Sequence, residues 1–342
     1  MKTIFNLFVA VLFSVAVQAQ SRDKDPFISK SFSNETINEV YARTSGGSIS
    51  VTGGTGQARV EVFIQGNNGR TLSNEEIKRR LDEDYKFVLA VDNGELKVTA
   101  EPKDKFFNWK QALNISFNVY VPHNVSTDLS TSGGSIEMEN LSGTQNFSTS
   151  GGSLKLNKLS GRIKGRTSGG GIDVSNTKDD IDLSTSGGGI TAENCSGTLK
   201  LNTSGGQIRL EGLRGMITAS TSGGPIHGSD IKGELLAHTS GGGVDLQDLS
   251  GSVEASTSGG NMDVEINELD KYVTIKNSGG NIHVKLPGDK GLNLNVRGDN
   301  IRIDNMSNFS GNKEEHKVEG KLNGGGVPVN IQSNGNITVA LN

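Results

Sequence analysis

Three closely spaced carboxylates, Asp179, Asp180 and Asp182, form the group in this sequence that most resembles an acid–base site. Paired carboxylates on a β-helix can cleave a polysaccharide, so a lyase or hydrolase is one hypothesis for the protein. The same places of an 18-residue repeat, described below, carry Arg162 in the unit before and Lys200 in the unit after. Alternating sign between stacked strands removes like-charge repulsion. We therefore predict that these carboxylates are structural and that the protein is not an enzyme.

Residues that ligate metals are present but scattered. The chain has five histidines: His123, His227, His238, His283 and His316. His227 and His238 fall at different places of the repeat, so we expect them on different faces of the fold. Calcium-binding β-rolls need Asp at every turn, whereas Asp173, Asp245 and Asp263 are outward residues between apolar neighbours. The sequence thus predicts no metal site and no cofactor.

The place of the repeat that holds these aspartates varies from unit to unit. Along the chain it reads Glu137, Lys155, Asp173, Thr191, Arg209, His227, Asp245 and Asp263. A column of such mixed chemistry is expected to be a solvated face and not a site.

The repeat itself begins with Thr-Ser-Gly-Gly, which recurs at a constant spacing. Its copies start at Thr131, Thr149, Thr167, Thr185, Thr203, Thr221, Thr239 and Thr257. Each unit carries two apolar segments of period 2, such as Val244/Leu246 and Val253/Ala255, and period 2 indicates a strand. A fixed period of this size indicates a solenoid. We predict an all-β fold, a parallel β-helix or β-solenoid whose 18-residue coils contain two strands each.

The corners of the coils should be formed by glycines and hydroxyls. The glycines at the third place of each unit are expected to make the turn and to supply positive φ: Gly133, Gly151, Gly169, Gly187, Gly205, Gly223, Gly241 and Gly259. The stacked threonines beside them are expected to hydrogen-bond along the stack and hold the corner. Ordered outward threonine arrays also bind ice, so an ice-binding protein is a further alternative. Cys195 takes an inward place elsewhere filled by leucine, which predicts a buried thiol.

Residues 1–19 have the pattern of a secretory signal peptide. Met1-Lys2 precedes an apolar run from Ile4 to Val17, and small residues lead to a cleavage point after Ala19. No later run reaches transmembrane length, and a single cysteine excludes an internal disulfide framework. We expect an exported protein of the periplasm, the outer surface or the extracellular space.

Three regions should follow the leader. Residues 20–125 are expected to form an N-terminal cap and irregular coils, with a helix at 73–81 and a flap at 102–111. Ser73 and Glu76 fit a capping box, and the basic residues that follow should fill the last turn of the helix. Residues 126–286 form the regular solenoid, and residues 287–342 form irregular C-terminal coils and a cap.

The flap is the most irregular part of the sequence and carries three large aromatics. Phe106, Phe107 and Trp109 are candidate ligand-binding residues, because exposed aromatic rings can stack on sugars. The alternative is that they pack across the end of the solenoid as a cap.

Four features occur together in this sequence: a signal peptide, a Val121-Pro122 step, tandem Ser-Gly-Gly-x-Ile-x-Val units and a closing Asn-Gly-x-Ile strand. In this combination the sequence resembles the bacterial putative-adhesin family. The resemblance implies a parallel β-helix at the cell envelope, of unknown biochemical function and without catalytic residues. The net charge of −4 offers no basic surface for nucleic acid. Our hypothesis is a non-enzymatic, exported, adhesin-like binding or structural module. Surface glycans or envelope proteins are its expected partners, and its oligomeric state stays open.

Overall fold

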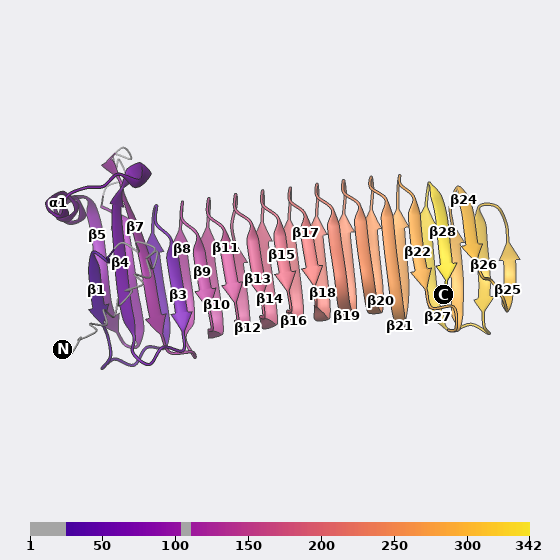
Figure 1. Ribbon diagram of the computed structural model, residues 1–342, viewed down its shortest axis with the longest axis horizontal. Coiled ribbons are helices and arrows are strands. Elements are labelled where there is room, and N and C mark those ends of the chain that lie inside the picture. Colours follow the sequence, from indigo (N-terminus) through magenta and orange to yellow (C-terminus); the bar gives the residue numbers. More distant parts are fainter. Residues whose placement is uncertain (1–24, 104–110) are drawn as a thin grey trace, which may run out of the picture.

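The computed structural model describes residues 25–103 and 111–342, which form a long rod of stacked strands with a helix at its N-terminal end (Figure 1). The N-terminal elements are β1 (Ile28–Ser31), β2 (Glu39–Thr44), β3 (Ile49–Gly53), β4 (Arg59–Gly66), η1 (Asn67–Gly69), α1 (Asn74–Asp84), β5 (Tyr85–Asp92), β6 (Glu95–Pro102) and β7 (Leu113–Val121). Within the described ranges, no helix is both long and apolar enough to cross a membrane.

The regular part of the rod contains fifteen strands. They are β8 (Ser126–Thr131), β9 (Ile136–Glu139), β10 (Ser142–Thr149), β11 (Leu154–Asn157), β12 (Ser160–Arg166), β13 (Ile172–Ser175), β14 (Lys178–Thr185), β15 (Ile190–Glu193), β16 (Ser196–Thr203), β17 (Ile208–Glu211), β18 (Arg214–Thr221), β19 (Ile226–Thr239), β20 (Val244–Thr257), β21 (Met262–Asn277) and β22 (Ile282–Leu286). The C-terminal elements are β23 (Leu292–Arg297), β24 (Asn300–Asp304), β25 (Phe309–Lys313), β26 (Lys317–Leu322), β27 (Val327–Ser333) and β28 (Asn336–Leu341).

From β8 to β18 each coil contains one long and one short strand, whereas β19, β20 and β21 each cover both places as one continuous strand. Equivalent segments of successive coils pair in parallel. On the long-strand face Ser142 of β10 pairs with Ser160 of β12. On the short-strand face Leu154 of β11 pairs with Ile172 of β13. The partners in both pairs occupy the same place of successive repeat units, so one unit of the sequence repeat equals one coil. The predicted all-β solenoid with two-strand, 18-residue coils is confirmed.

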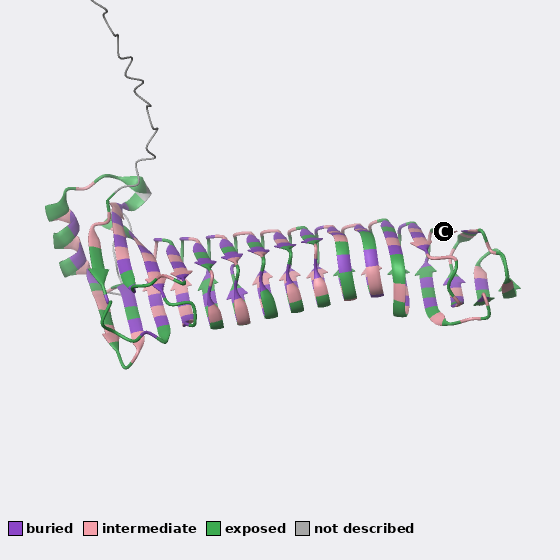
Figure 2. Cartoon of the chain, turned by 60° about the horizontal axis from the view of Figure 1, so that its bottom comes forward, coloured by how far each residue is buried: buried purple, intermediate pink, exposed green. Residues whose placement is uncertain are grey.

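A thin apolar layer runs through the centre of the coils. Leu154 and Leu156 of β11 are at most 2% exposed, while Lys155 between them faces outward. The same alternation gives the strands of the rod their stripes of buried and exposed residues in Figure 2. Cys195 lies in this layer at 1% exposure, as its leucine-like place predicted. Burial raises the pKa of its thiol.

The Gly-Gly corner works differently from the prediction. None of the eight glycines at the third place of the unit has a positive φ, so that expectation is wrong. These residues lie in the bend between a long and a short strand, and a Cβ on Gly151 would stay 3.5 Å from its nearest neighbour. A Cβ on the following Gly152 would lie 2.0 Å from the carbonyl oxygen of Gly134 in the preceding coil. Close stacking of backbones, and not a left-handed conformation, therefore requires glycine at the fourth place.

Left-handed residues occupy the other corner of the coil. The first residue of this corner is, for example, Asn140 (φ 56°) in one coil and Asn194 (φ 52°) in another. The place three residues further on holds glycine in most coils, such as Gly143 (φ 123°) and Gly215 (φ 117°). Asparagine and glycine are the residues that adopt this region at least cost. Asp179 has a φ of 83° at a place where most other coils have glycine.

The order of coils along the rod differs from their order in the sequence at both ends. The strands β2 and β3 form one coil, which lies between β6–β7 on one side and β8–β9 on the other. At the opposite end, β27 and β28 lie between the coil of β21–β22 and the coil of β23–β24. The first coil of the parallel stack and the last segment of the chain are thus both covered by other strands.

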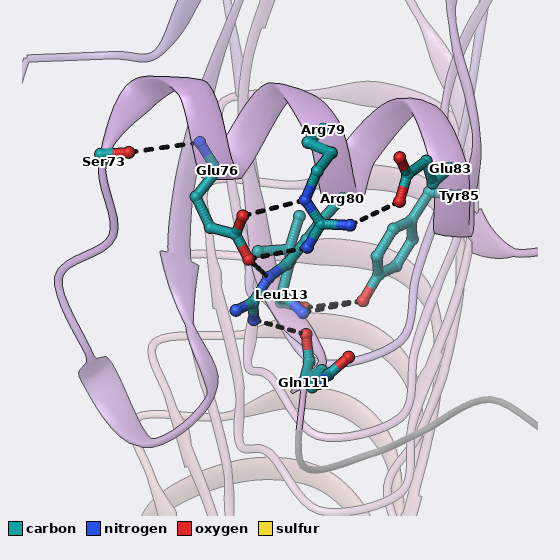
Figure 3. A network of polar contacts seen from close by, with 8 residues as sticks. All are labelled: Ser73, Glu76, Arg79, Arg80, Glu83, Tyr85, Gln111 and Leu113. Atoms are coloured by element: carbon teal, nitrogen blue, oxygen red, sulfur yellow. Dashed lines mark hydrogen bonds and ion pairs between the residues drawn. The ribbon is translucent and has the colours of Figure 1, made fainter.

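Helix α1 begins as predicted and ends later. Ser73 caps it, since its hydroxyl accepts from the N–H of Glu76, but the helix continues to Asp84 instead of stopping at residue 81. The expected basic last turn is therefore wrong, because the extension is acidic. Arg79 bonds to Glu76 on one side and Glu83 on the other, which stabilises this extra turn (Figure 3).

Candidate functional site

The threonines of the repeat form a ladder inside the Gly-Gly corner. Thr149 donates a hydrogen bond of 2.8 Å to the carbonyl oxygen of Gly134 in the preceding coil, and it accepts one from the N–H of Gly152. The same pattern recurs from Thr131 to Thr257, whose exposures lie between 0 and 6%. The expected hydrogen bonding along the stack is confirmed. Because these hydroxyls are buried and bonded, the exposed threonine array that an ice-binding surface needs is not formed by them.

The serines of the repeat, in contrast, face solvent. Ser132, Ser150, Ser168, Ser186 and Ser204 follow the threonines, and all are exposed. Successive members of this serine column are one strand spacing apart, about 4.8 Å.

A second line of polar residues lies one place before each threonine, near the end of each long strand. Between this line and the serine column runs a groove of about 620 Å³ that spans five coils. Its lining is Ser130, Thr131, Ser132, Ser148, Thr149, Ser150, Arg166, Thr167, Ser168, Ser184, Thr185, Ser186, Asn202, Thr203 and Ser204. We call it the serine groove. It offers a continuous line of hydroxyl groups with Arg166 as the charged member of its lining, which suits an extended polar ligand.

The carboxylates that suggested acid–base chemistry take part in structural contacts. Asp180 lies 3.6 Å from Arg162 of the coil before it, and both side chains are more than half exposed. Asp179 accepts a hydrogen bond of 2.9 Å from the N–H of Gly161. Asp182 pairs in register with Lys164 on one side and Lys200 on the other. The predicted alternation of charge is present.

A column on the short-strand face brings together residues that the sequence seemed to scatter. His227, Asp245 and Asp263 are in register on β19, β20 and β21, and His283 follows them on β22. The insertion near Tyr272 makes the separation of Asp263 and His283 in the sequence longer than one repeat unit. His283 therefore does not fall at this place when the sequence is divided into units of constant length. These four residues, the His–Asp column, line a groove of about 550 Å³.

The insertion itself forms a small polar cluster on the long-strand face. It appears as a register shift within β21, where Gly251 pairs with Leu269 and Val253 with Val273. Tyr272 reaches back two coils and donates a hydrogen bond of 2.9 Å to Glu234. Burial and this contact with Glu234 raise the pKa of Tyr272 to about 12.

At the N-terminal end, α1 is held by a network of charges (Figure 3). Hydrogen bonds from Arg79 and Arg80 lower the pKa of Glu76 to about 2. Arg80 also donates to the carbonyl oxygen of Gln111. Beneath the helix, the N–H of Leu113 donates a hydrogen bond of 2.8 Å to the Tyr85 hydroxyl, and burial raises the pKa of that phenol.

A cleft of about 620 Å³ lies between α1 and the first strands. It is lined by Phe27, Ile28, Phe63, Leu72, Ile77 and Leu81 together with polar residues at its rim. The predicted ligand-binding residues Phe106, Phe107 and Trp109 lie outside the described residues, and their role stays a prediction.

Comparisons with known proteins agree with the architecture. The family model described as Toastrack DUF4097 matches residues 225–340, the C-terminal third of the chain. This third of the chain is similar to Toastrack proteins. The comparison with curated proteins gives no match.

Four chains of solved structures also match. One is described as a "putative cell adhesion protein" from Clostridium sporogenes ATCC 15579, and the match covers 92% of this chain and 98% of that one. Its identity of 11% and TM-score of 0.19 are too low to support an argument about this protein.

Proposed function

We propose that this protein is a non-enzymatic, exported solenoid that acts as an adhesin-like binding and structural module of the cell envelope. The serine groove supports this proposal most directly, because it presents an exposed serine hydroxyl at the same place of each of five coils. A ligand with a repeating polar structure, such as a surface glycan, can bond to several coils at once. Many weak contacts along one chain add up to useful affinity.

A glycan array with the mature protein tests the binding part of the proposal. We expect one class of extended glycan to be retained by the wild type and lost from the triple variant S150A, S168A and S186A. These serines are exposed, so the fold should not change. The matched control is the double variant S160A and S196A at the opposite corner, which should bind like the wild type. Equal retention by all three proteins would remove the serine groove as the binding surface.

Export and location have separate tests. N-terminal sequencing of the secreted protein should begin at Gln20, if the leader is cleaved after Ala19 as its sequence predicts. Labelling of intact cells with a membrane-impermeant reagent should reach the protein. A wholly periplasmic location would remove the adhesion role and leave a scaffold. Depolymerisation of a uronic-acid polymer by the purified protein would instead support the lyase alternative.

A further inference from the structure

One edge of the rod, the edge that holds the serine groove, carries basic side chains along its length. The place one residue before each threonine of the ladder stays in register from β2 to β21, so its residues form a single column. Its ionisable members are Arg43, Arg166, His238 and Lys276, and its other members are serine or asparagine. We call it the cation column. Its strands lie side by side along the rod in Figure 1.

The turns that follow the cation column are uncharged. In the described coils, every such turn from residues 44–48 to residues 277–281 lacks acidic and basic side chains. The chain as a whole has more acidic than basic residues, 38 against 34. An edge whose charged residues are all basic is therefore a segregation of charge and does not reflect the composition.

The opposite corner of the coils has a different arrangement of charge. Basic residues such as Lys178 and Arg214 occur there too, but carboxylates lie among them. Arg214 forms an ion pair of 2.7 Å with Asp230. Glu193 and Glu211 end their short strands at the same corner. A basic group at that corner thus has counter-ions within the protein.

Arg166 lies at the middle coil of the serine groove, and its guanidinium has no counter-ion among the described residues. Its side chain is exposed, and its neighbours in register are Ser148 and Ser184. The carboxylate of Asp182 belongs to the next strand, but its own register neighbours are Lys164 and Lys200. The charge of Arg166 is therefore open to a ligand in the groove.

Further along the column, Lys276 has the same properties. It is exposed, it pairs in register with Ser256 and Gln332, and no ion pair to it is formed within the described ranges. His238 lies between Arg166 and Lys276 and is also exposed, with its ring 2.8 Å from the hydroxyl of Ser256. Arg43 differs, because Asp128 already neutralises it at 2.8 Å.

The spacing of these groups sets the length of a ligand that contacts them together. Lys276 is six strands from Arg166 in the register of the column, which is about 29 Å at about 4.8 Å per strand. The serines and Asn202 between them offer hydroxyl and amide groups that both donate and accept hydrogen bonds. This surface fits an extended polymer that has many hydroxyls and carries negative charges at intervals.

We propose that the ligand of this edge is an anionic polysaccharide, whose carboxylate or sulfate groups bond to Arg166 and Lys276. This inference rests on the proposed function and adds the charge of the ligand to it. The guanidinium of Arg166 can bond to either group with two parallel hydrogen bonds. Nucleic acid fits less well, because grooves for single strands also stack bases on aromatic rings. The residues that line the serine groove include none.

Two pairs of polymers, each with one backbone, test the proposal and separate carboxylate from sulfate. They are polygalacturonate with its methyl ester, and dextran sulfate with dextran. We expect the mature wild type to bind the charged member of at least one pair about tenfold more tightly than the neutral member, with an affinity that falls as salt is added. The double variant R166Q and K276Q should lose about this factor, since one exposed ion pair contributes up to a factor of about five.

The double variant K178Q and K232Q provides the matched control. It removes the same charge from two exposed residues at the opposite corner and should bind like the wild type. Equal affinity for the charged and neutral members of both pairs, an equal loss in the two double variants, or tighter binding of single-stranded DNA than of any polysaccharide would overturn the inference.

The glycan array separates this result from the proposed function. If the array retains only neutral glycans, and does so through the serines, the inference is wrong and the proposed function stands. If neither the array nor any of the four polymers shows binding, both are wrong.

Discussion

The hydroxyl of Thr203 donates a hydrogen bond of 2.7 Å to the carbonyl oxygen of Gly188, which lies one coil earlier in the stack. The same hydroxyl accepts from the N–H of Gly206 in its own coil. One side chain thus satisfies two backbone groups at a corner where the regular strand pairing stops. Repetition of this contact along the rod explains why threonine recurs at the first place of the unit.

Removal of this hydroxyl should therefore destabilise the protein. In Thr203→Val the shape of the side chain is kept, but the carbonyl of Gly188 and the N–H of Gly206 lose their partner in a place that is 6% exposed. Leaving a buried polar group unsatisfied costs about 1–3 kcal/mol. Urea unfolding should show a loss of this size. The control Thr203→Ser keeps the hydroxyl and should lose clearly less; a Thr203→Val protein as stable as the wild type would contradict the role of the hydrogen bonds.

The two glycines of a corner should respond very differently to alanine. Gly152→Ala places a methyl group 2.0 Å from a backbone oxygen of the neighbouring coil, where no flexible side chain can give way. Overpacking of this kind costs about 1–3 kcal/mol, and more where backbone must move. Gly151→Ala meets its nearest atom at 3.5 Å and should be nearly neutral. Thermal unfolding of the two variants compares them directly, and an equal effect would contradict the stacking argument.

Helix α1 should weaken in acid. The pKa of Glu76 is about 2 in the folded protein, below its ordinary value of 4.5, because Arg79 and Arg80 bond to the ionised form. A depressed pKa contributes stability that is present above the ordinary value and is lost as the pH falls through the folded value. The protection factors of the α1 amides, which are exchange rates corrected for the intrinsic pH dependence of exchange, should therefore fall between about pH 4.5 and 2. In Glu76→Gln this pH dependence should be absent; if it persists unchanged, another group is responsible.

The single thiol should be unreactive in the native protein. Cys195 is 1% exposed, and burial raises the pKa of its thiol, so little thiolate forms at neutral pH. Ellman's reagent should give no rapid colour with folded protein and one equivalent of colour in denaturant. Fast labelling under native conditions would show that the core opens around β15 and β16.

The repeating part of the fold could be predicted from the sequence because period and burial are local properties. Leu154 and Leu156 sit at places whose inward direction follows from the two-residue period, and Cys195 sits at a place that other units fill with leucine. The threonine ladder also follows, since identical residues one repeat unit apart must stack. These predictions need no knowledge of distant segments.

Other features depend on relationships that the repeat does not encode. The place of His283 follows only from the altered register near Tyr272, which lengthens one coil. Glycine at the fourth place is needed because of the backbone of the preceding coil, whereas the propensity of a single residue predicts only a turn. The order of coils at the two ends is set by long-range pairing, about which the period of the repeat says nothing.

The insertion of β28 between β22 and β24 has a mechanical consequence. A strand at the open end of a stack can be peeled away one hydrogen bond at a time when it is pulled. β28 is held by parallel partners on both of its edges, Ile282 to Leu286 on one side and Asn300 to Asp304 on the other. Tension applied to β28 must break the hydrogen bonds of both ladders, so this strand should resist detachment better than the last strand of a solenoid in which that strand lies outermost.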